Sequence, residues 1–433
     1  MPEEPPASAV DEAVRRLLAP VGPAGLPVPA YSGRSLPNIT RSAVDATGAE
    51  VGDDPPLSPP LEAGLDPFAG RRAEGPVVIF LVDGFGWFPF HAWASPGNGP
   101  LAERWARLAH PITTIFPTTT TSALTSLSTA TPPGRNGVVG YRQFLPSFGV
   151  VADLLKMTPV GIAPPDSLIG PEWTPSIISG APTVFRRGVK GTALSRDKFK
   201  GSGFTRLLYD GATYVSYVTA SDLAHQLTSL LGRTDPPSLL FAYWDELDTV
   251  HHVRGPHGSL FEFEAERLAL LVRHVARGLE PSRARQTTLL VTGDHGLVPT
   301  DGAAQLRVDR VPEIVREMGR PLAGDRRAGY FAAQPGRAPA LRAALEERLP
   351  KGSRIVAVEE ALRAGLFGPP PHHPEILARI GDLIAFVPAP HGLTYFPPGA
   401  VPPSRDLLGA HGGLAPEELI VPLVAGSLSE FLG

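Results

Sequence analysis

The chain has 433 residues, enough for one large α/β domain with insertions or for two to three ordinary domains. Its net charge of −4 at pH 7 is small, which indicates neither a nucleic-acid footprint nor a polybasic membrane surface. It contains no cysteine, which excludes structural disulfides, thiolate zinc sites and a cysteine nucleophile, including a sulfatase nucleophile made from cysteine.

The N-terminal segment predicts neither a secretory signal nor a membrane span. Residues 1–22 are acidic and lack the basic-then-apolar pattern of a signal, and the longest apolar runs are far too short to cross a bilayer. We therefore expect a cytoplasmic protein. Residues 11–20 predict a short amphipathic helix. Residues 21–75 are rich in Pro, Gly and Ser and predict an extended arm, either packed over the main domain or partly mobile.

Four short apolar runs predict buried strands of one sheet. They lack the alternation of a half-exposed strand, which favours a parallel sheet covered by helices on both faces. The four runs are 76–82, 238–244, 287–292 and 419–424.

Between these strands the sequence predicts helices and two long excursions. The expected helices are 99–109, 220–232, 260–279 and 337–349. The stretches 141–235 and 301–408 are longer than simple crossovers require, so we expect both to contribute to a cap above the sheet. The predicted organisation is an N-terminal helix and arm at 1–75, followed by a catalytic domain with cap insertions at 76–433.

Polar residues of metal-binding type follow three of the predicted strands. Because ligands in open α/β sheets bind beyond the carboxyl ends of the strands, motifs far apart in sequence can converge there. A fourth, Gly-rich segment with a histidine precedes the last strand. The four segments contain Asp83-Gly84, Asp248 with His252, Asp294-His295, and His411.

Each of these segments also has a purely structural interpretation. An Asp-Gly pair is a common strand-to-turn signal, and a histidine in a Gly-rich loop is common turn chemistry. Asp248 and His252 share a helical face and can bind one ion, but such pairs often make only surface contacts. The glycines around Asp294-His295 permit a backbone that aims both side chains at one metal. Together, three aspartates and three histidines are sufficient for two metal sites.

A run of four threonines at 118–121 follows Pro117 and precedes a predicted helix at 121–130. One of these threonines is expected to cap that helix. A hydroxyl at a helix N-terminus also faces free N–H groups and the positive end of the dipole, which suits an alkoxide nucleophile and a phosphoryl group. Threonine is a weak nucleophile at neutral pH, and metal coordination is the usual way to activate it.

In this order the motifs resemble those of the type I phosphodiesterase/nucleotide pyrophosphatase family of the alkaline phosphatase superfamily, from about residue 77 to 424. The family's Pro-Thr-x-Thr segment matches 117–120 and selects Thr120 as the nucleophile. The other four family motifs match Asp83-Gly84, Glu246-Leu247-Asp248 with His252 and 255–256, Asp294-His295-Gly296, and Gly409-Ala410-His411-Gly412.

The resemblance implies an alkaline-phosphatase-like three-layer α/β/α sandwich with a mostly parallel central sheet and cap insertions. It also implies two divalent metal ions, with zinc as the first choice and manganese or magnesium as alternatives. One ion is held by Asp83, Thr120, Asp294 and His295, and the other by Asp248, His252 and His411. His251 is then a neighbour, and Asp245 and His257 are supporting residues.

The implied function is hydrolysis of a small-molecule phosphate ester or nucleotide through a phospho-threonine intermediate. The chain departs from the family at Thr129-Ala130, where Thr-Gly is usual, and at Asn136-Gly137, where His-Gly is usual. Tyr141 replaces the asparagine that commonly contacts a phosphoryl oxygen. Its hydroxyl can still donate a hydrogen bond, so Tyr141 is a candidate substrate contact and the choice between diester and monoester stays open.

Three alternatives remain. The first is a phosphomonoesterase or phosphonate hydrolase of the same superfamily, and the second is a phosphomutase, although these usually carry a serine nucleophile. The third is a catalytically inactive metal-binding module. The sequence predicts no oligomeric state.

Overall fold

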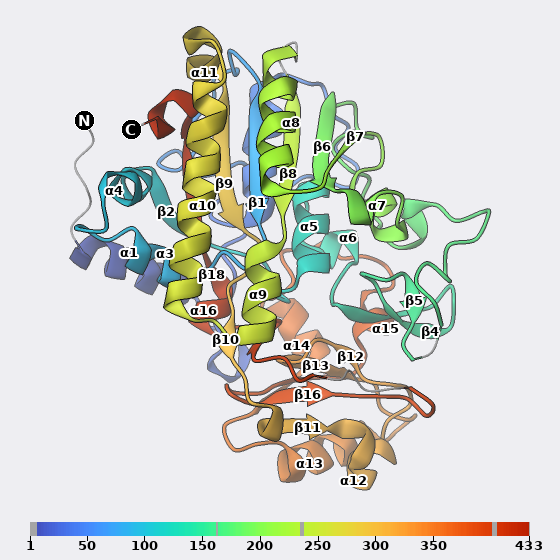
Figure 1. The fold of residues 1–433 in the computed structure, drawn as a ribbon. Helices are drawn as coiled ribbons and strands as arrows, with labels where there is room; N and C mark the ends of the chain where they lie inside the picture. Colours follow the sequence, from blue (N-terminus) through green and yellow to red (C-terminus); the bar gives the residue numbers. More distant parts are fainter. Residues whose placement is uncertain (1–6, 162, 234–237, 401–404, 433) are drawn as a thin grey trace.

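The computed structural model describes residues 7–161, 163–233, 238–400 and 405–432. The parts of the predicted arm and cap stretches at 1–6, 162, 234–235 and 401–404 lie outside the described residues. Figure 1 shows a large sheet flanked by helices in the upper half of the molecule and a second sheet with small helices below it.

The large sheet has seven strands among the described residues. Five neighbouring strands, β9, β1, β8, β6 and β7, are parallel, which confirms the mostly parallel sheet that the sequence predicts. In spatial order the strands are β2 (Ala109–Thr113), β18 (Ile420–Ser427), β9 (Thr288–Gly293), β1 (Val77–Val82), β8 (Leu239–Trp244), β6 (Gly191–Arg196) and β7 (Thr213–Tyr217).

One of the four predicted strands runs against this direction. Strand β18 pairs antiparallel with both β9 and β2. The short helix α16 (Pro416–Leu419) precedes it directly, and Gly296, just past the carboxyl end of β9, donates its N–H to Glu418 in that helix. The chain therefore enters β18 at the edge where the parallel strands end, and it has to run back.

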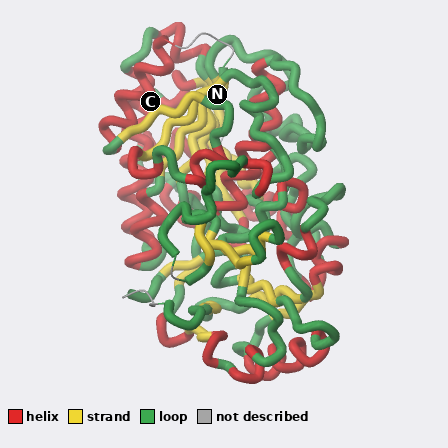
Figure 2. Tube along the Cα trace, turned by 90° about the vertical axis from the view of Figure 1, so that its right-hand side faces the viewer, coloured by secondary structure: helices red, strands yellow, loops and turns green. Residues whose placement is uncertain are grey.

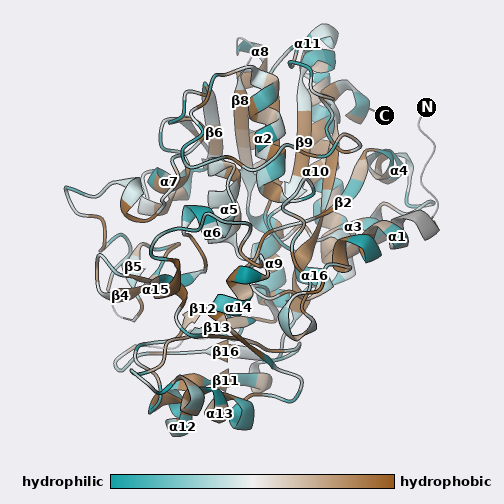
Figure 3. Cartoon of the chain, turned by 180° about the vertical axis from the view of Figure 1, so that it is seen from behind, coloured by the Kyte–Doolittle hydropathy of each residue, from teal (hydrophilic) through white to brown (hydrophobic). Residues whose placement is uncertain are grey.

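Helices cover both faces of the large sheet (Figures 2 and 3). The side chains of β1 alternate between two core clusters, one on each face. Val78 and Phe80 belong to a core cluster that includes residues of α8 (Ala220–Arg233) and α10 (Gly258–Arg277). Val77 and Ile79 belong to a second cluster with residues of α2 (Leu36–Thr47) and α5 (Thr120–Thr129). Both faces are apolar because both are buried, which explains why the strand sequences are continuous apolar runs.

Helix α2 (Leu36–Thr47) lies inside the segment expected to be an extended arm. The residues that begin and end this helix can be found in the sequence. Ser35 forms a capping box with Asn38, and Pro37 lies in the first turn. Gly48 ends the helix with φ +68°. Ser, Pro and Gly at these positions start and stop a helix, but by composition alone they resemble a loop. Ten of its twelve residues are buried, so α2 is part of the sandwich.

The helices predicted from periodicity are confirmed within a few residues of each end. They are α1 (Ala7–Leu18), α4 (Pro100–Arg107), α8, α10 and α13 (Ala338–Arg348), and the helix expected after the threonine run is α5 (Thr120–Thr129). Within the described ranges no helix is long and apolar enough to cross a membrane.

The second sheet draws strands from both of the long excursions. Its strands β12 and β3 join the two stretches through the pairing of Gly324 with Arg142. In the described residues its order is β14 (Arg354–Ala357), β15 (Leu383–Phe386), β13 (Ala328–Phe331), β12 (Ala323–Gly324), β3 (Arg142–Leu145), β4 (Val150–Asp153) and β5 (Thr158–Pro159). Strands β6 and β7 lie in the first excursion but extend the large sheet. The division of the chain into arm, catalytic domain and caps stays a proposal.

Candidate metal centre

The carboxyl ends of the central strands bring the predicted ligands together. Asp83 follows β1, Asp294 follows β9, and α9 (Glu246–Arg254), which carries Asp248, follows β8. The backbone N–H of Asp248 donates to the carbonyl oxygen of Asp83 at 3.1 Å, which ties the start of α9 to the end of β1. In Figure 1, α9 extends from this edge of the large sheet toward the second sheet.

Two groups of side chains place their ligand atoms within 4.8 Å of one another. One group is Asp83, Asp294 and His295, and the other is Asp248, His295 and His411. His295 belongs to both groups, so the two groups are adjacent. His252 lies beside the second group, with its Nε2 atom 3.2 Å from Oδ2 of Asp248 and its ring centroid 5.2 Å from that of His411.

The three histidines share one hydrogen-bonding pattern. Nδ1 of His252 lies 2.8 Å from the carbonyl oxygen of Gly409, Nδ1 of His411 lies 2.9 Å from that of Thr118, and Nδ1 of His295 lies 3.2 Å from that of Gly296. A carbonyl oxygen can only accept, so Nδ1 carries the hydrogen in each ring. The Nε2 lone pairs of His295 and His411 are therefore available to a metal, and the carbonyls fix the orientation of the rings. Burial lowers the pKa of His252, but Asp248 raises it to about 9, so a metal would have to displace the proton that its Nε2 shares with Asp248.

The three carboxylates also share a pattern. Oδ1 of Asp294 accepts from the backbone N–H groups of Gly84 and His295, both at 3.0 Å, and Oδ2 of Asp83 accepts from the hydroxyl of Tyr243. The second oxygen of each of these residues is buried without a hydrogen-bond partner, as is Oδ1 of Asp248. Buried carboxylate oxygens without partners are costly, and a bound cation would satisfy all three. The donor set therefore fits metal ions.

Electrostatics lead to the same conclusion. Burial, followed by the charges of Asp294 and Asp248, raises the pKa of Asp83 well above its usual value. Burial, followed by the neighbouring His295 and His252, lowers the pKa of His411 well below its usual value. Crowded buried carboxylates favour a cation between them, and a neutral imidazole is the form that binds a metal.

Of the four consecutive threonines, Thr120 is the one whose hydroxyl contacts a predicted ligand. It is the first residue of α5, and its Oγ1 atom lies 3.2 Å from Nε2 of His295. The hydroxyl of Thr121 donates to the carbonyl oxygen of Gly140 at 3.0 Å instead. The hydroxyl of Thr118 donates to Gly413 O at 3.0 Å and accepts from Gly412 N at 2.9 Å.

Tyr141, the candidate substrate contact, forms a side-chain hydrogen bond with Asp153. Burial, followed by the charge of Asp153, raises the pKa of its hydroxyl. Since this hydroxyl already has an internal partner, a contact with substrate would require it to bind both or to move. The role of Tyr141 stays a prediction.

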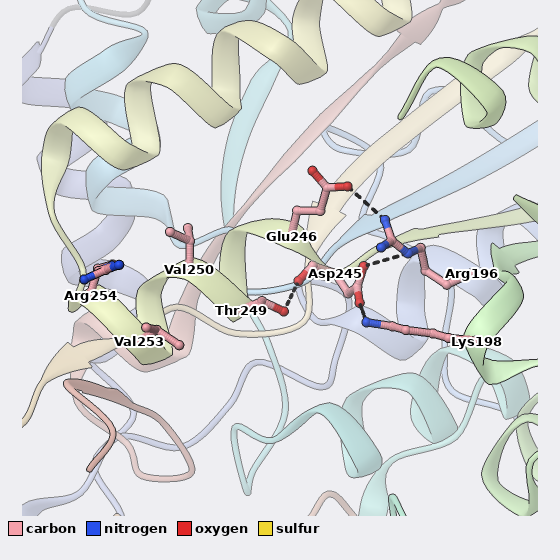
Figure 4. Close-up of a pocket in the computed structure, with 8 residues that line it drawn as sticks. All are labelled: Arg196, Lys198, Asp245, Glu246, Thr249, Val250, Val253 and Arg254. Atoms are coloured by element: carbon pink, nitrogen blue, oxygen red, sulfur yellow. Dashed lines mark hydrogen bonds and ion pairs between the residues drawn. The ribbon is translucent and has the colours of Figure 1, made fainter. Parts of the chain in front are cut away.

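The structure also places Asp245 and His257, which were predicted to support the site, and His251, which was predicted to be a neighbour of it. Asp245 accepts from Lys198 Nζ at 2.6 Å and lines a cavity of about 320 Å³ (Figure 4). Thr249, Val250 and Val253 of α9 line the same cavity, whereas Asp248 and His252 do not. His251 is buried, and neither of its ring nitrogens has a hydrogen-bond partner. His257 occupies the N-cap of α10.

Several residues that contact the predicted ligands were not found from the sequence. Tyr243 lies within an apolar strand, where nothing marks its hydroxyl as functional. Glu418 accepts from Gly413 N at 2.9 Å and Ala415 N at 3.2 Å, which shapes the loop that carries His411. Asp325 of the second sheet places Oδ2 3.9 Å from Nδ1 of His411. The contacts of Tyr243 and Asp325 join segments far apart in the chain, so no local pattern encodes them. The contacts of Glu418 are local and form the capping box of α16, but nothing in that pattern marks a metal site.

Comparison with known proteins gives one family and a consistent fold. The family described as type I phosphodiesterase / nucleotide pyrophosphatase matches residues 77–413. No curated protein matches the chain by sequence.

Among solved structures, murine ectonucleotide pyrophosphatase/phosphodiesterase 5 is similar with a TM-score of 0.60 and 19% identity, covering 81% of this chain and 87% of that chain. An inactive threonine-to-alanine variant of that murine protein, in complex with AMP, is similar at 0.60 and 18% identity, covering 82% and 88%. Phosphonoacetate hydrolase from Sinorhizobium meliloti 1021, in complex with phosphonoacetate, is similar at 0.57 and 18% identity, covering 84% and 96%.

Proposed function

The chain belongs to the type I phosphodiesterase/nucleotide pyrophosphatase family, whose members are metal-dependent hydrolases acting on phosphoester bonds, and on that premise we propose that it hydrolyses phosphoric esters with two metal ions and Thr120 as the nucleophile. The observation that carries the proposal is the contact between Thr120 Oγ1 and His295 Nε2 at 3.2 Å, inside two adjoining groups of metal-ligand type.

We propose that Asp83, Asp294, His295 and Thr120 hold one ion and that Asp248, His252 and His411 hold the other. Mixed carboxylate and imidazole donors without thiolates suit zinc, and manganese or magnesium are the alternatives. When bound, two such ions lower the pKa of a coordinated hydroxyl and neutralise charge on the attacking and leaving oxygens.

The nucleophilic step follows from the position of Thr120 at the head of α5. Thr120 loses its hydroxyl proton to water and its Oγ1 forms a bond to phosphorus, while the ester oxygen leaves with the bonding electron pair and takes up a proton from water. Backbone N–H groups of the first turn of α5 are available to the phosphoryl oxygens, which carry negative charge. Water then cleaves the phospho-threonine bond, which releases the phosphoryl product and restores the hydroxyl. The inactivity of the threonine-to-alanine variant of the murine protein supports a threonine in this role.

The substrate is proposed to be a small phosphate ester or a nucleotide, in line with the AMP complex of the murine protein. Hydrolysis of a phosphonate is the second candidate, because a phosphonoacetate hydrolase is covered over 96% of its length. The two reactions share the fold and metal requirement and differ in the group next to phosphorus.

A panel of bis-aryl phosphodiester, aryl phosphomonoester, phosphonoacetate and nucleotide substrates tests the proposal. We expect turnover of at least one ester, loss of turnover on chelation, and recovery on adding zinc. A metal-loaded, folded protein that turns over none of the four would contradict it.

A further inference from the structure

The turn between β12 and β13 carries an acidic residue to the metal centre from the second sheet. The N–H of Asp325 donates to the carbonyl oxygen of Ala328 at 2.9 Å, which closes this turn. Its Oδ2 atom lies 3.9 Å from Nδ1 of His411. Gly412 makes this approach possible: its φ is +108°, and a Cβ there would lie 2.5 Å from the Cβ of Asp325. None of the five family motifs includes Asp325.

The carboxylate of Asp325 is only half satisfied within the protein. Its Oδ1 accepts from the backbone N–H of Arg326 at 2.6 Å, whereas Oδ2 is buried and has no hydrogen-bond partner. Among the described residues no lysine or arginine forms an ion pair with it, and Arg142, across the pairing of β3 with β12, donates to Tyr395 O at 3.0 Å. An unpaired buried carboxylate is costly and is retained most often where it has a function.

The charges around this carboxylate define what it can do. The pKa of Asp325 is raised because the carboxyl is buried, although contacts with the Thr119 hydroxyl and with the N–H and charge of Arg326 lower it. Two bound divalent cations would favour the ionised form. Three ligand carboxylates and Asp325 then balance the charge of two divalent ions. A substrate phosphoryl group at Thr120 would lie beside Thr119 and thus close to this negative charge.

We infer that Asp325 is a specificity-determining residue that favours substrates with one negative charge on the reacting group over substrates with two. This inference rests on the proposed function and refines its substrate class. Phosphodiesters carry one such charge, whereas phosphomonoesters carry two above neutral pH. The fixed negative charge of Asp325 weakens binding of a dianionic group more than binding of a monoanionic one. The difference between these two losses of binding free energy sets the preference for diesters.

The test uses the full-length, metal-loaded protein at pH 8 with two 4-nitrophenyl substrates, a phosphodiester and a phosphomonoester. Asp325→Asn removes the charge and keeps the shape. It should raise the ratio of kcat/KM for monoester to that for diester by about 10-fold or more, as expected for one charge at short range in a partly screened site. Asp325→Glu should keep the wild-type ratio. Glu317→Gln, which removes a carboxylate paired with Arg337 on the second sheet's side of the molecule, is the matched control and should leave the ratio unchanged.

An activity-free readout separates this inference from the proposed function. Calorimetric titration with inorganic phosphate, a dianion at this pH, should show binding about 10-fold tighter to Asp325→Asn than to wild type, with metal content unchanged. If no ester is hydrolysed but phosphate binding tightens as stated, the proposed function fails, and only the discrimination of bound anions by the charge of Asp325 stands. An unchanged substrate ratio together with unchanged phosphate affinity overturns the inference. So does loss of a metal ion from Asp325→Asn, since Asp325 would then act on the ion and not on the substrate.

Discussion

His411 donates its Nδ1 hydrogen to the carbonyl oxygen of Thr118 at 2.9 Å, across 293 positions of the chain. The hydroxyl of the same threonine bonds Gly412 and Gly413. Thr118 therefore fixes both the ring and the loop of a proposed metal ligand, and it does so from the segment that presents Thr120. Residues 118–120 therefore connect the proposed nucleophile to the loop that carries one proposed metal ligand.

Removing the Thr118 hydroxyl should weaken metal binding. Thr118→Val keeps the volume of the side chain but leaves Gly412 N and Gly413 O without their partner. We expect a loss of about 10- to 100-fold in affinity for one ion, as for other residues that orient metal ligands. Titration of metal into protein that has been stripped with a chelator measures this affinity. Thr121→Val is the matched control, because its hydroxyl bonds Gly140 instead. Equal metal affinities in the two variants would contradict the role of Thr118.

The hydroxyl of Tyr243 should position Asp83. In Tyr243→Phe the oxygen of Asp83 that accepts this hydroxyl loses its partner, so the carboxylate is free to rotate away from the ion. We expect about 10-fold weaker binding of one ion, with a change in stability of about 1 kcal/mol. The control is Tyr217→Phe, which removes the hydroxyl that donates to the backbone oxygen of Tyr243 at 2.8 Å and leaves Asp83 untouched. Metal affinity that falls equally in both variants would argue against a specific role for the Tyr243 hydroxyl.

Replacement of His411 should release one of the two proposed metal ions and leave the other bound. His411→Ala removes a ligand of only one proposed ion, so elemental analysis should fall from about two ions per chain toward one. The remaining ion should lie at Asp83, Asp294 and His295, where anomalous scattering can locate it. Two fully bound ions in this variant would contradict the assignment.

In the metal-free protein, ionised Asp83 should lower the free energy of unfolding. Its pKa in the folded protein is raised, chiefly by burial, above the value of about 3.9 expected in the unfolded chain. The unfolded chain therefore loses this proton first, and the ionised group opposes folding increasingly as pH rises from about 4 toward the raised pKa. In chelated protein, Asp83→Asn should raise the free energy of unfolding at pH 7 by more than about 1 kcal/mol, with the gain fading toward pH 4.

Urea unfolding at several pH values measures this effect. With metal bound, the sign should reverse, because the variant lacks a ligand and gains less from the ion. A destabilised, metal-free Asp83→Asn at neutral pH would show that the carboxylate is satisfied without a cation.

The sequence predicted the parts of the structure that local pattern encodes. Continuous apolar runs predicted the strands, and motif order predicted the residues that meet beyond their carboxyl ends. It did not predict α2, because Ser35, Pro37 and Gly48 resemble a loop unless their spacing is considered. The direction of β18 was also missed, because an apolar run carries no information on which end the chain enters.

The supporting contacts of the site were beyond the reach of sequence patterns for a different reason. Thr118 and Tyr243 act through hydrogen bonds across 293 and 160 positions of the chain. Asp325 acts from the second sheet, and Glu418 acts through backbone groups of its own loop. Each is an ordinary residue in its local context. Only the tertiary fold shows that its polar atoms contact a ligand residue.

The most direct test of the central claim is the turnover of Thr120→Ala on a chromogenic phosphodiester, measured beside Thr119→Ala and with the metal content of both. Thr119 is the neighbouring rival, because it is the N-cap of α5, directly before Thr120, and its side chain is buried. We expect Thr120→Ala to keep its fold and metal ions and to lose turnover by several orders of magnitude, as loss of a nucleophile does, while Thr119→Ala loses far less. Near-normal turnover in Thr120→Ala, with turnover abolished in Thr119→Ala, would contradict the assignment of the nucleophile.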